Sequence, residues 1–281
     1  MNILVTLDSN YLKPLKVMLL SLFYNNPGQC ICIYVVHSSI TDGEIDELRS
    51  FIKEYNNDIH SIRIDNTYFK NAPEVMYYSR EMYYRLLSHK FLPQDIDKAL
   101  YLDPDILVIN PLNELYKMDM ENFLYGAAYH ARVPVKEINK LRLQAYEMDE
   151  YFNSGVLMMN LSLQRKKIDE HEIFNYVERY KNRLIMPDQD ILNALYSRQI
   201  KDIDEIKYNY DPRYYQYNKI ISNGKYDMDY IMRNTSIIHF CGKKKPWHKN
   251  YNGKFHALYK HYEILALERE RNLTLNDNRI R

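Results

Sequence analysis

Short apolar runs alternate with longer amphipathic stretches over the first hundred residues, and this alternation predicts repeated strand–helix units. The apolar run ILVTL (3–7) has the pattern of a buried strand, and from Pro14 apolar residues recur at helical spacing. A second apolar run, CICIYVVH (30–37), precedes TDGE (41–44), which has the spacing of a helix capping box. The first fifty residues therefore predict two strands, each followed by a helix.

Two more strands are predicted before the next change of pattern. HSIRID (60–65) alternates apolar and polar residues, Ser79 can cap a helix that runs to about Phe91, and KALYLD (98–103) is a buried strand. Repeated units of this length are typical of an α/β fold with a mostly parallel central sheet and helices on both faces.

A mixed pattern continues after residue 110. Helices are predicted over 172–180 and after PDQD (187–190), and strands at FLYGAAY (123–129), GVLMMNL (155–161) and TSIIHFCG (235–242). A chain of 281 residues with 46% hydrophobic content can bury one large core. We therefore expect one α/β domain over residues 1–252 and a helical segment over residues 253–281.

Charge and the length of the apolar runs argue against a nucleic-acid partner and against a membrane span. Lysine and arginine total 38 against 37 aspartate and glutamate residues, so the net charge is only +1 and no nucleic-acid partner is expected. No run approaches the roughly 18 apolar residues of a membrane span, and the N-terminus lacks the pattern of a secretion signal. We expect a cytoplasmic protein without a transmembrane segment, and peripheral attachment to the inner face of the membrane stays open.

The three cysteines predict neither disulfides nor a zinc site. Cys30 and Cys32 would share one face of a strand, and Cys241 lies far from both in sequence. Buried thiols in a reducing compartment are the expectation. A zinc site is not expected, because Cys30 and Cys32 lack the spacing of a zinc finger.

Two carboxylates stand where a buried strand ends, in KALYLDPDILVIN (98–110). Asp103 and Asp105 would point the same way on an extended chain, and Pro104 between them removes a hydrogen-bond donor from the sheet. Ligands of open parallel sheets bind beyond the carboxyl ends of the strands. Paired carboxylates there require a cation, a proton or solvation. Two interpretations stay open, a divalent metal with a bound phosphate and a solvated turn.

A second motif, IIHFCGKKKPWH (237–248), combines an imidazole with a run of lysines. His239 ends an apolar strand, Gly242 permits close approach to the backbone, and the run ends at Lys245. A core histidine followed by a solvated loop is one interpretation. The other is a metal ligand beside ammonium groups that neutralise a diphosphate.

Two further segments carry polar or aromatic side chains that could bind a ligand. The tyrosine-rich segment YNYDPRYYQY (208–217) either folds over a ligand or forms an amphipathic rim. The motif MPDQD (186–190) opens a predicted helix, which a capping role would also explain. Its polar residues are Asp188, Gln189 and Asp190.

Five of these motifs, taken in order, resemble the family 8 glycosyltransferases, the retaining group that includes bacterial lipopolysaccharide α-galactosyltransferases, general stress protein A homologues and glycogenin. The resemblance implies the GT-A nucleotide-sugar-binding fold, with one Rossmann-like sheet, and a UDP-sugar as donor. The motifs that carry it are LDSNY (7–11), YLDPDILV (101–108), YFNSGVLMMNL (151–161), PDQDILN (187–193) and HFCGKKKPWH (239–248).

The resemblance also implies a role for each matching residue. The metal ligands, for Mn²⁺ with Mg²⁺ able to replace it, are Asp103, Asp105 and His239. The contacts to the UDP-sugar are Thr6, Asp8, Asn10, Tyr11, Arg85, Asn153, Gly242 and Lys245. The catalytic group is Gln189, nearest the anomeric carbon, with Asp188 beside it and Asp190 as a nucleophile only if the pocket rearranges.

The implied reaction moves galactose or glucose from UDP to a hydroxyl group of a glycan or lipid-linked acceptor with α linkage. Charge develops on the departing UDP, where the metal and Lys245 would stabilise it. Retaining hydrolases use a carboxylate nucleophile, whereas this chain has the amide Gln189 at the matching position. Same-face attack by the acceptor is therefore the favoured mechanism.

One departure from the family pattern leaves alternatives open. His130 follows GAAY where many relatives carry an aspartate, so a UDP-sugar-binding protein without transferase activity is one alternative. The other is a phosphatase of the haloacid dehalogenase type with Asp103 as nucleophile, although such enzymes usually carry Thr or Val where this chain has Leu107. Acceptor contacts are expected from residues 131–150 and from the tyrosine-rich segment. The acceptor and the oligomeric state are not predicted.

Overall fold

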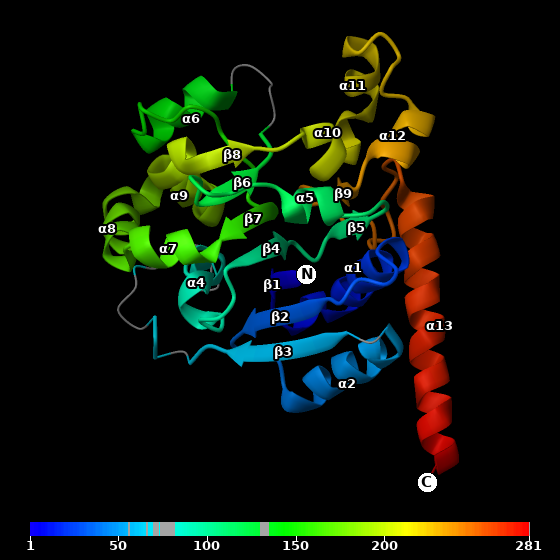
Figure 1. Ribbon diagram of the computed structural model, residues 1–281. Coiled ribbons are helices and arrows are strands. Elements are labelled where there is room, and N and C mark those ends of the chain that lie inside the picture. The colour runs from blue at the N-terminus through cyan, green and yellow to red at the C-terminus, as the bar shows by residue number, and fades with distance from the viewer. Residues whose placement is uncertain (56, 66, 70–72, 74–81, 130–134, 281) are drawn as a thin grey trace.

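The computed structural model describes residues 1–281 except 56, 66, 70–72, 74–81, 130–134 and 281. Among the described residues, a seven-stranded sheet has the order β3–β2–β1–β4–β7–β6–β8 (Figure 1). Its strands are β1 (Asn2–Thr6), β2 (Cys32–His37), β3 (Asp58–Arg63), β4 (Lys98–Leu102), β6 (Tyr125–Ala127), β7 (Val156–Asn160) and β8 (Ile200–Asp202). A separate two-stranded ribbon pairs β5 (Ile106–Val108) with β9 (Ile237–His239).

The central sheet is mostly parallel, as the sequence predicts. β1 is parallel to β2 and β4, β2 to β3, and β6 to β8. The exception is β7, which is antiparallel to both of its neighbours, β4 and β6. Because of this reversal, β7 begins at the edge of the sheet where β4 ends. Residues before β7 therefore lie beside residues after β4.

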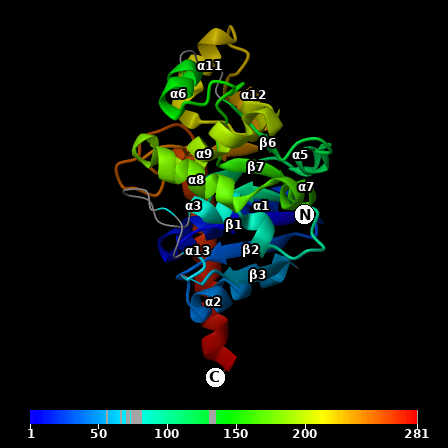
Figure 2. The same ribbon diagram turned by 90° about the vertical axis from the view of Figure 1, so that its left-hand side faces the viewer.

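Helices surround the sheet and account for most of the remaining described residues (Figures 1 and 2). The α-helices are α1 (Leu12–Asn25), α2 (Asp42–Ile52), α3 (Met82–Leu86), α4 (Ser88–Phe91), α5 (Asn113–Lys117), α6 (Val135–Leu143), α7 (Leu161–Lys167), α8 (Glu170–Tyr180), α9 (Pro187–Tyr196), α10 (Glu205–Tyr208), α11 (Tyr215–Ile221), α12 (Met228–Asn234) and α13 (His256–Ile280). Short 3₁₀ helices are η1 (Ser9–Tyr11), η2 (Lys53–Tyr55), η3 (Lys181–Arg183), η4 (Ser197–Gln199) and η5 (Pro212–Tyr214).

The side chains of β1 alternate between two hydrophobic cores, one on each face of the sheet. Ile3 and Val5 belong to one core and Leu4 to the other, and all three are fully buried. Leu15 and Met18 of α1 pack into the same core as Ile3. Successive strand residues point to opposite faces, so this division confirms that the sheet is covered on both sides.

Two predicted helix starts have different outcomes. The capping box at Thr41 is confirmed, because its hydroxyl accepts from the amide of Glu44 at 3.3 Å and the Glu44 carboxylate accepts from the Thr41 amide at 2.8 Å. Ser79, the other predicted cap, lies outside the described residues. The helix predicted after it ends at Phe91 as expected, but a turn at Leu87 divides it into α3 and α4.

The helix α13 runs alongside α1 and passes α2 (Figure 1). Phe255, Tyr259 and Ala266 are buried in the core that α1 lines, and Lys16 Nζ of α1 lies 2.5 Å from Glu270 Oε1. The segment 253–281 thus shares the core of the sheet, and its status as a separate unit stays a prediction. No helix in the described ranges is long and apolar enough to cross a membrane.

The cysteines differ from the prediction of buried thiols. Cys30 is exposed, Cys32 and Cys241 are partly buried, and all three are free. The strand β2 begins only at Cys32, and Cys30 lies at the surface, where its carbonyl accepts from the N-terminal amino group of Met1 at 2.5 Å.

Candidate functional site

The candidate site forms at the edge of the sheet where β4 ends and β7 begins. The amide of Asp103, directly after β4, donates to the carbonyl of Gly155, directly before β7, at 2.9 Å. Leu102 is paired with Val156 across the same two strands. The antiparallel direction of β7 therefore places the NSG sequence at 153–155 beside the two carboxylates of the DPD sequence.

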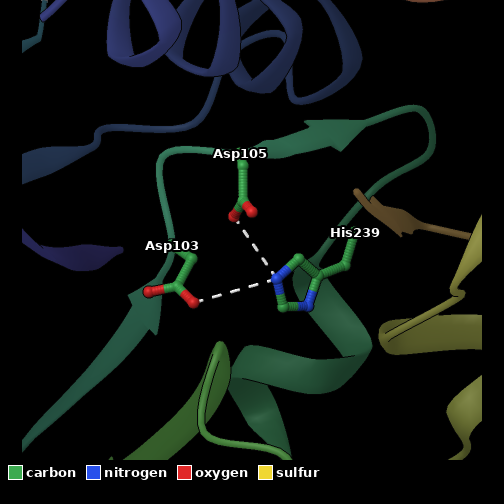
Figure 3. Close-up of side chains that lie close together, drawn as sticks. All are labelled: Asp103, Asp105 and His239. Carbon is green, nitrogen blue, oxygen red and sulfur yellow. Dashed lines mark ion pairs between the residues drawn. The ribbon is translucent and has the colours of Figure 1, made fainter. Parts of the chain in front are cut away.

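The two carboxylates converge by a different route from the one predicted. The chain makes a turn at Pro104 and Asp105 rather than continuing as a strand, and this turn leads into β5. In the β5–β9 ribbon, Ile106 lies opposite His239, which brings the imidazole next to Asp105. Figure 3 shows all three side chains directed toward one point. His239 Nε2 lies 3.3 Å from Asp105 Oδ1 and 3.8 Å from Asp103 Oδ2.

Positive side chains surround this cluster of Asp103, Asp105 and His239. Arg85 donates to Asp103 Oδ1 at 2.5 Å and also to Asp188, and Lys245 donates to Asp105 Oδ2. These contacts confirm that residues from distant parts of the sequence meet at one place. Their roles in binding a donor stay predictions.

The pKa values of the cluster reflect burial and mutual charge. Burial raises the pKa of the Asp103 carboxyl, and Arg85 opposes that effect. Burial would also raise the pKa of Asp105, but His239 and Lys245 hold it well below its usual range. Burial disfavours a charged His239, yet Cys241 and Asp105 together raise its pKa well above the ordinary value. A metal ion that binds between the carboxylates must therefore displace a proton from His239.

Two observations show that the cluster fits a divalent cation. Asp105 Oδ1 is buried and makes no hydrogen bond of normal geometry among the described residues, so only the ion pair with His239 Nε2 at 3.3 Å offsets the cost of burying this oxygen, and a bound cation would replace that ion pair. A Cβ at Gly155 would overlap the His239 ring and lie 2.7 Å from Asp103 Oδ2, so only glycine leaves the cluster open on that side. Two carboxylates and one imidazole suit a hard or intermediate divalent ion such as Mn²⁺.

A chain of amide side chains connects His239 to Gln189, and the sequence did not reveal it. Asn209 Oδ1 lies 2.8 Å from His239 Nδ1, and Asn209 Nδ2 donates to Asn153 Oδ1 at 2.9 Å. Asn153 Nδ2 then donates to Gln189 Oε1 at 3.1 Å. The backbone amides of Gly155 and Ser154 also donate to Asn153 Oδ1 and Gln189 Oε1, which fixes the orientation of both amides.

This orientation determines which nitrogen of His239 faces the carboxylates. Because Asn209 Nδ2 is the donor to Asn153, Asn209 Oδ1 is left to accept a proton from His239 Nδ1. Nε2 then faces the carboxylates and would bind a metal once its own proton is lost, an arrangement common among metal-binding histidines. No motif marks Asn209. It reaches this place because Tyr210 beside it exchanges backbone hydrogen bonds of 3.0 and 2.9 Å with Ile237 and His239.

Asp188 and Asp190 occupy different environments at the start of α9. Asp188 accepts from Arg85 and from Ser154 Oγ at 3.1 Å, within reach of the cluster. Asp190 is fully buried and accepts from both Arg142 Nη atoms at 2.6 and 2.8 Å and from Tyr151 Oη at 2.5 Å. It also accepts from the backbone amides of residues 185 and 186, so its role as a nucleophile would require all these contacts to break.

The residues predicted to hold the nucleotide lie at the end of β1 and in the turn after it. Asp8 caps η1 by accepting from the Asn10 amide at 2.9 Å, and Thr6 Oγ1 lies 3.2 Å from Tyr101 Oη. Burial raises the pKa of the Tyr11 phenol, and the nearby charges of the cluster contribute, so Tyr11 lies close to it. These residues share one edge with the cluster.

Other predicted positions are placed less directly. Gly242 has a φ of +87°, which glycine adopts without strain, and lies beside Arg213 rather than against the cluster. In the tyrosine-rich segment, Tyr210 and Tyr215 are buried in the core, while Tyr217 is exposed. His130 lies outside the described residues.

A mostly parallel sheet with this cluster at its carboxyl edge is the arrangement that the resemblance to GT-A glycosyltransferases implies. Residues 2–251 match the model of glycosyl transferase family 8, and the chain therefore belongs to that family. This confirms the resemblance drawn from the five motifs. It also sets aside the phosphatase alternative.

Curated relatives and solved structures agree with the family. General stress protein A of Bacillus subtilis is 25% identical over 276 residues, which cover 93% of this chain and 92% of that protein. A lipopolysaccharide 1,2-glucosyltransferase of Escherichia coli is 29% identical over 253 residues, 86% of this chain and 71% of the relative. The galactosyltransferase LgtC, solved with donor and acceptor sugar analogues, superposes with a TM-score of 0.78 at 26% identity, covering 94% of this chain and 95% of LgtC.

Proposed function

We propose that this chain transfers a hexose, glucose or galactose, from UDP to a hydroxyl group of a glycan or lipid-linked acceptor, with retention of configuration and α linkage. A glucosyltransferase and a galactosyltransferase among the similar proteins support the two candidate sugars. The observation that carries the proposal is Asp105 Oδ1, a buried carboxylate oxygen without a hydrogen bond that faces His239 Nε2.

In this proposal Asp103, Asp105 and His239 hold Mn²⁺, with Mg²⁺ able to replace it. When bound, the ion neutralises charge on the diphosphate of the donor. Lys245 adds a second positive charge next to the proposed metal position, since its ammonium group pairs with the ligand Asp105. The proposed contacts to the diphosphate are Gly242 and Lys245. The proposed contacts to uridine and ribose are Thr6, Asp8, Asn10 and Tyr11.

The reaction exchanges one bond at the anomeric carbon of the sugar. The bond from C1 to the phosphate oxygen breaks, and the oxygen keeps the electron pair. The acceptor oxygen forms the new bond to C1 on the same face, and its proton passes to the departing phosphate. Gln189 Oε1 already accepts two hydrogen bonds, from Asn153 Nδ2 and the Ser154 amide, which supports this route over covalent attack by Gln189.

Arg85 and Asp188 are the proposed contacts to the sugar itself. Arg85 joins Asp103 to Asp188 and also donates to Ser154 Oγ at 2.8 Å, so it ties the metal ligands to the first turn of α9. Both Nη nitrogens of Arg85 already donate to protein acceptors, Nη2 to Tyr101 and Asp103, so a bound sugar would have to share or replace one of these partners. We assign to Asp190 the support of the backbone before α9.

The test compares UDP release from UDP-glucose and UDP-galactose by the full chain with Mn²⁺ or Mg²⁺, since slow donor hydrolysis needs no acceptor. We expect metal-dependent release from one of the two. Asp105→Asn should reduce it at least about 100-fold, because a bound metal contributes several kcal/mol to stabilising the departing charge.

Asp46→Asn is the matched control, because Asp46 is an exposed aspartate of α2 that pairs with Arg49 on the same helix. Its turnover should equal that of the parent chain. Unchanged turnover in Asp105→Asn would remove the metal assignment. Metal-dependent UDP binding without hydrolysis of either sugar, and without transfer, would favour the non-catalytic alternative.

A further inference from the structure

A pocket of about 280 Å³ lies directly beyond the end of β9 and beside the cluster. Phe240, Cys241 and Gly242 line it and follow His239 in the chain, so the pocket and the metal-binding imidazole are separated by no more than a few residues. Lys245, Asp103, Asp105 and His239 do not line it. The pocket is therefore adjacent to the cluster but distinct from it.

The pocket is strongly positive. Its charged lining side chains are Arg213, Lys243 and Lys244, and its lining contains no aspartate or glutamate. Lys243 and Lys244 are exposed, in contrast to Lys245, which turns inward to Asp105. Asp211 pairs with Arg213 and offsets one of these three positive charges.

Asp211 holds the guanidinium of Arg213 in a fixed direction. Asp211 is almost fully buried and accepts from Arg213 Nε at 3.0 Å and from Nη2 at 2.6 Å. The remaining nitrogen, Nη1, faces Gly242, where a Cβ would lie only 2.6 Å from it. A pre-oriented guanidinium with a free edge is suited to bind a phosphate or carboxylate through paired hydrogen bonds.

We propose that this pocket binds an anionic group, a phosphate or a carboxylate, carried by the acceptor saccharide. The proposal rests on the proposed function, since an acceptor must approach the sugar at the neighbouring cluster. Tyr251 contributes an aromatic ring to the lining, and such rings pack against the apolar faces of sugars. The pocket thus combines charge for an anion with a surface for the ring that bears it.

The competing occupant is the diphosphate of the donor, because Gly242 belongs both to this pocket and to the predicted diphosphate contacts. The experiment therefore uses the full chain saturated with UDP and Mg²⁺, so that the donor position is filled. Isothermal titration calorimetry then measures binding of glucose 6-phosphate, glucuronate and glucose. We expect saturable binding of at least one charged sugar and at least tenfold weaker binding of glucose, since hydrogen bonds to a charged group are stronger than those between neutral groups.

The double variant Lys243→Gln/Lys244→Gln tests the assignment. It should weaken binding of the charged sugar by about tenfold and leave glucose unchanged. Lys166→Gln/Lys167→Gln is the matched control, because these are two adjacent, exposed lysines at the end of α7. Arg213→Gln is a less direct test, since it also leaves Asp211 buried without its partner.

Three results would overturn the proposal. One is binding of the charged sugars without UDP that disappears when UDP is present, which would assign the anion to the donor position. The others are equal binding of charged and neutral sugars, and charged-sugar binding that the double lysine variant leaves intact. Absence of UDP binding contradicts the proposed function itself. Normal UDP binding without preference for the charged sugars contradicts only this inference.

Discussion

Two buried carboxylates, Asp105 and Asp190, differ in how many of their oxygens accept hydrogen bonds from the protein. Asp190 is fully buried, and both of its oxygens accept hydrogen bonds from Arg142, with Tyr151 and two backbone amides completing its contacts. Asp105 is 6% exposed and accepts from Lys245 through Oδ2, whereas its Oδ1 is buried without a hydrogen bond. The two residues have the same charge and similar burial, and they differ in what the protein supplies to them.

This difference separates support from ligand binding. A buried carboxylate whose oxygens are all satisfied by protein donors gains nothing from a metal and holds nearby segments together. A buried carboxylate with an unsatisfied oxygen beside a second carboxylate and an imidazole is stabilised when a cation binds. We therefore assign Asp190 to the support of α9 and Asp105 to the metal.

The largest expected effect is on stability, in Asp190→Asn. Removing one partner of a buried ion pair leaves Arg142 uncompensated, and we expect the free energy of unfolding to fall by roughly 3–5 kcal/mol. Chemical denaturation monitored by circular dichroism measures this change. A loss below about 1 kcal/mol, with donor hydrolysis abolished in the folded protein, would instead indicate that Asp190 takes part in the reaction.

A double-mutant cycle provides the control. Arg142→Met alone should destabilise the protein by a similar amount, because it leaves Asp190 buried without its charge partner. Together, Arg142→Met and Asp190→Asn should cost less than the sum of the single changes, since the double variant retains neither charge of the pair and so leaves none unpaired. Additive losses would contradict the coupling of this pair.

The cluster of Asp103, Asp105 and His239 was predictable from the sequence in its members but not in its geometry. The DPD sequence after a buried strand and His239 at the end of another indicated three ligands. The end of the strand at Pro104 was predicted, whereas the short ribbon that follows it was not, and the pairing of β5 with β9 in that ribbon brings His239 to Asp105. Nor could the sequence show that β7 runs antiparallel, which is what places Gly155 and Asn153 beside Asp103.

The supporting contacts were beyond sequence reasoning, because their partners lie far apart in the chain. Asp190 follows Gln189 directly and was therefore treated as a candidate nucleophile. Its partner Arg142 is 48 residues earlier, and no local pattern connects the two. Asn209 lies in a segment that attracted attention for its tyrosines. The positions of strands and helices were predictable because they depend on nearby residues, whereas the hydrogen bonds of Asp190 and Asn209 depend on the final packing.

A smaller effect is expected from removing the support of a metal ligand, in Asn209→Ala. Without the acceptor at Nδ1, His239 can rotate or carry its proton on Nε2, and we expect Mn²⁺ affinity to fall about 10- to 100-fold. Titration followed by the electron paramagnetic resonance signal of free Mn²⁺ measures this without any turnover. Asn209→Asp keeps an acceptor for Nδ1 and should recover most of the affinity. Equal affinity in the parent chain and Asn209→Ala would show that Asn209 does not orient His239.

The smallest effect is a pH dependence of stability that arises at the cluster of Asp103, Asp105 and His239 and not at Asp190. The pKa of His239 is raised in the folded protein, because Cys241 and Asp105 outweigh burial. Its contribution to stability is therefore fully present below about pH 6.5, the ordinary value, and is lost as the pH rises through the raised one. In chelator-treated protein, the free energy of unfolding from chemical denaturation should fall over this window with a slope of at most about 1.4 kcal/mol per pH unit, the limit for one proton. His239→Gln should remove that part of the slope.

Saturating Mn²⁺ should also remove this pH dependence, because the ion takes the place of the proton between His239 and the carboxylates. A slope that is the same in the parent chain and in His239→Gln would mean that the imidazole is already neutral, and that the carboxylates are balanced by Arg85 and Lys245 alone.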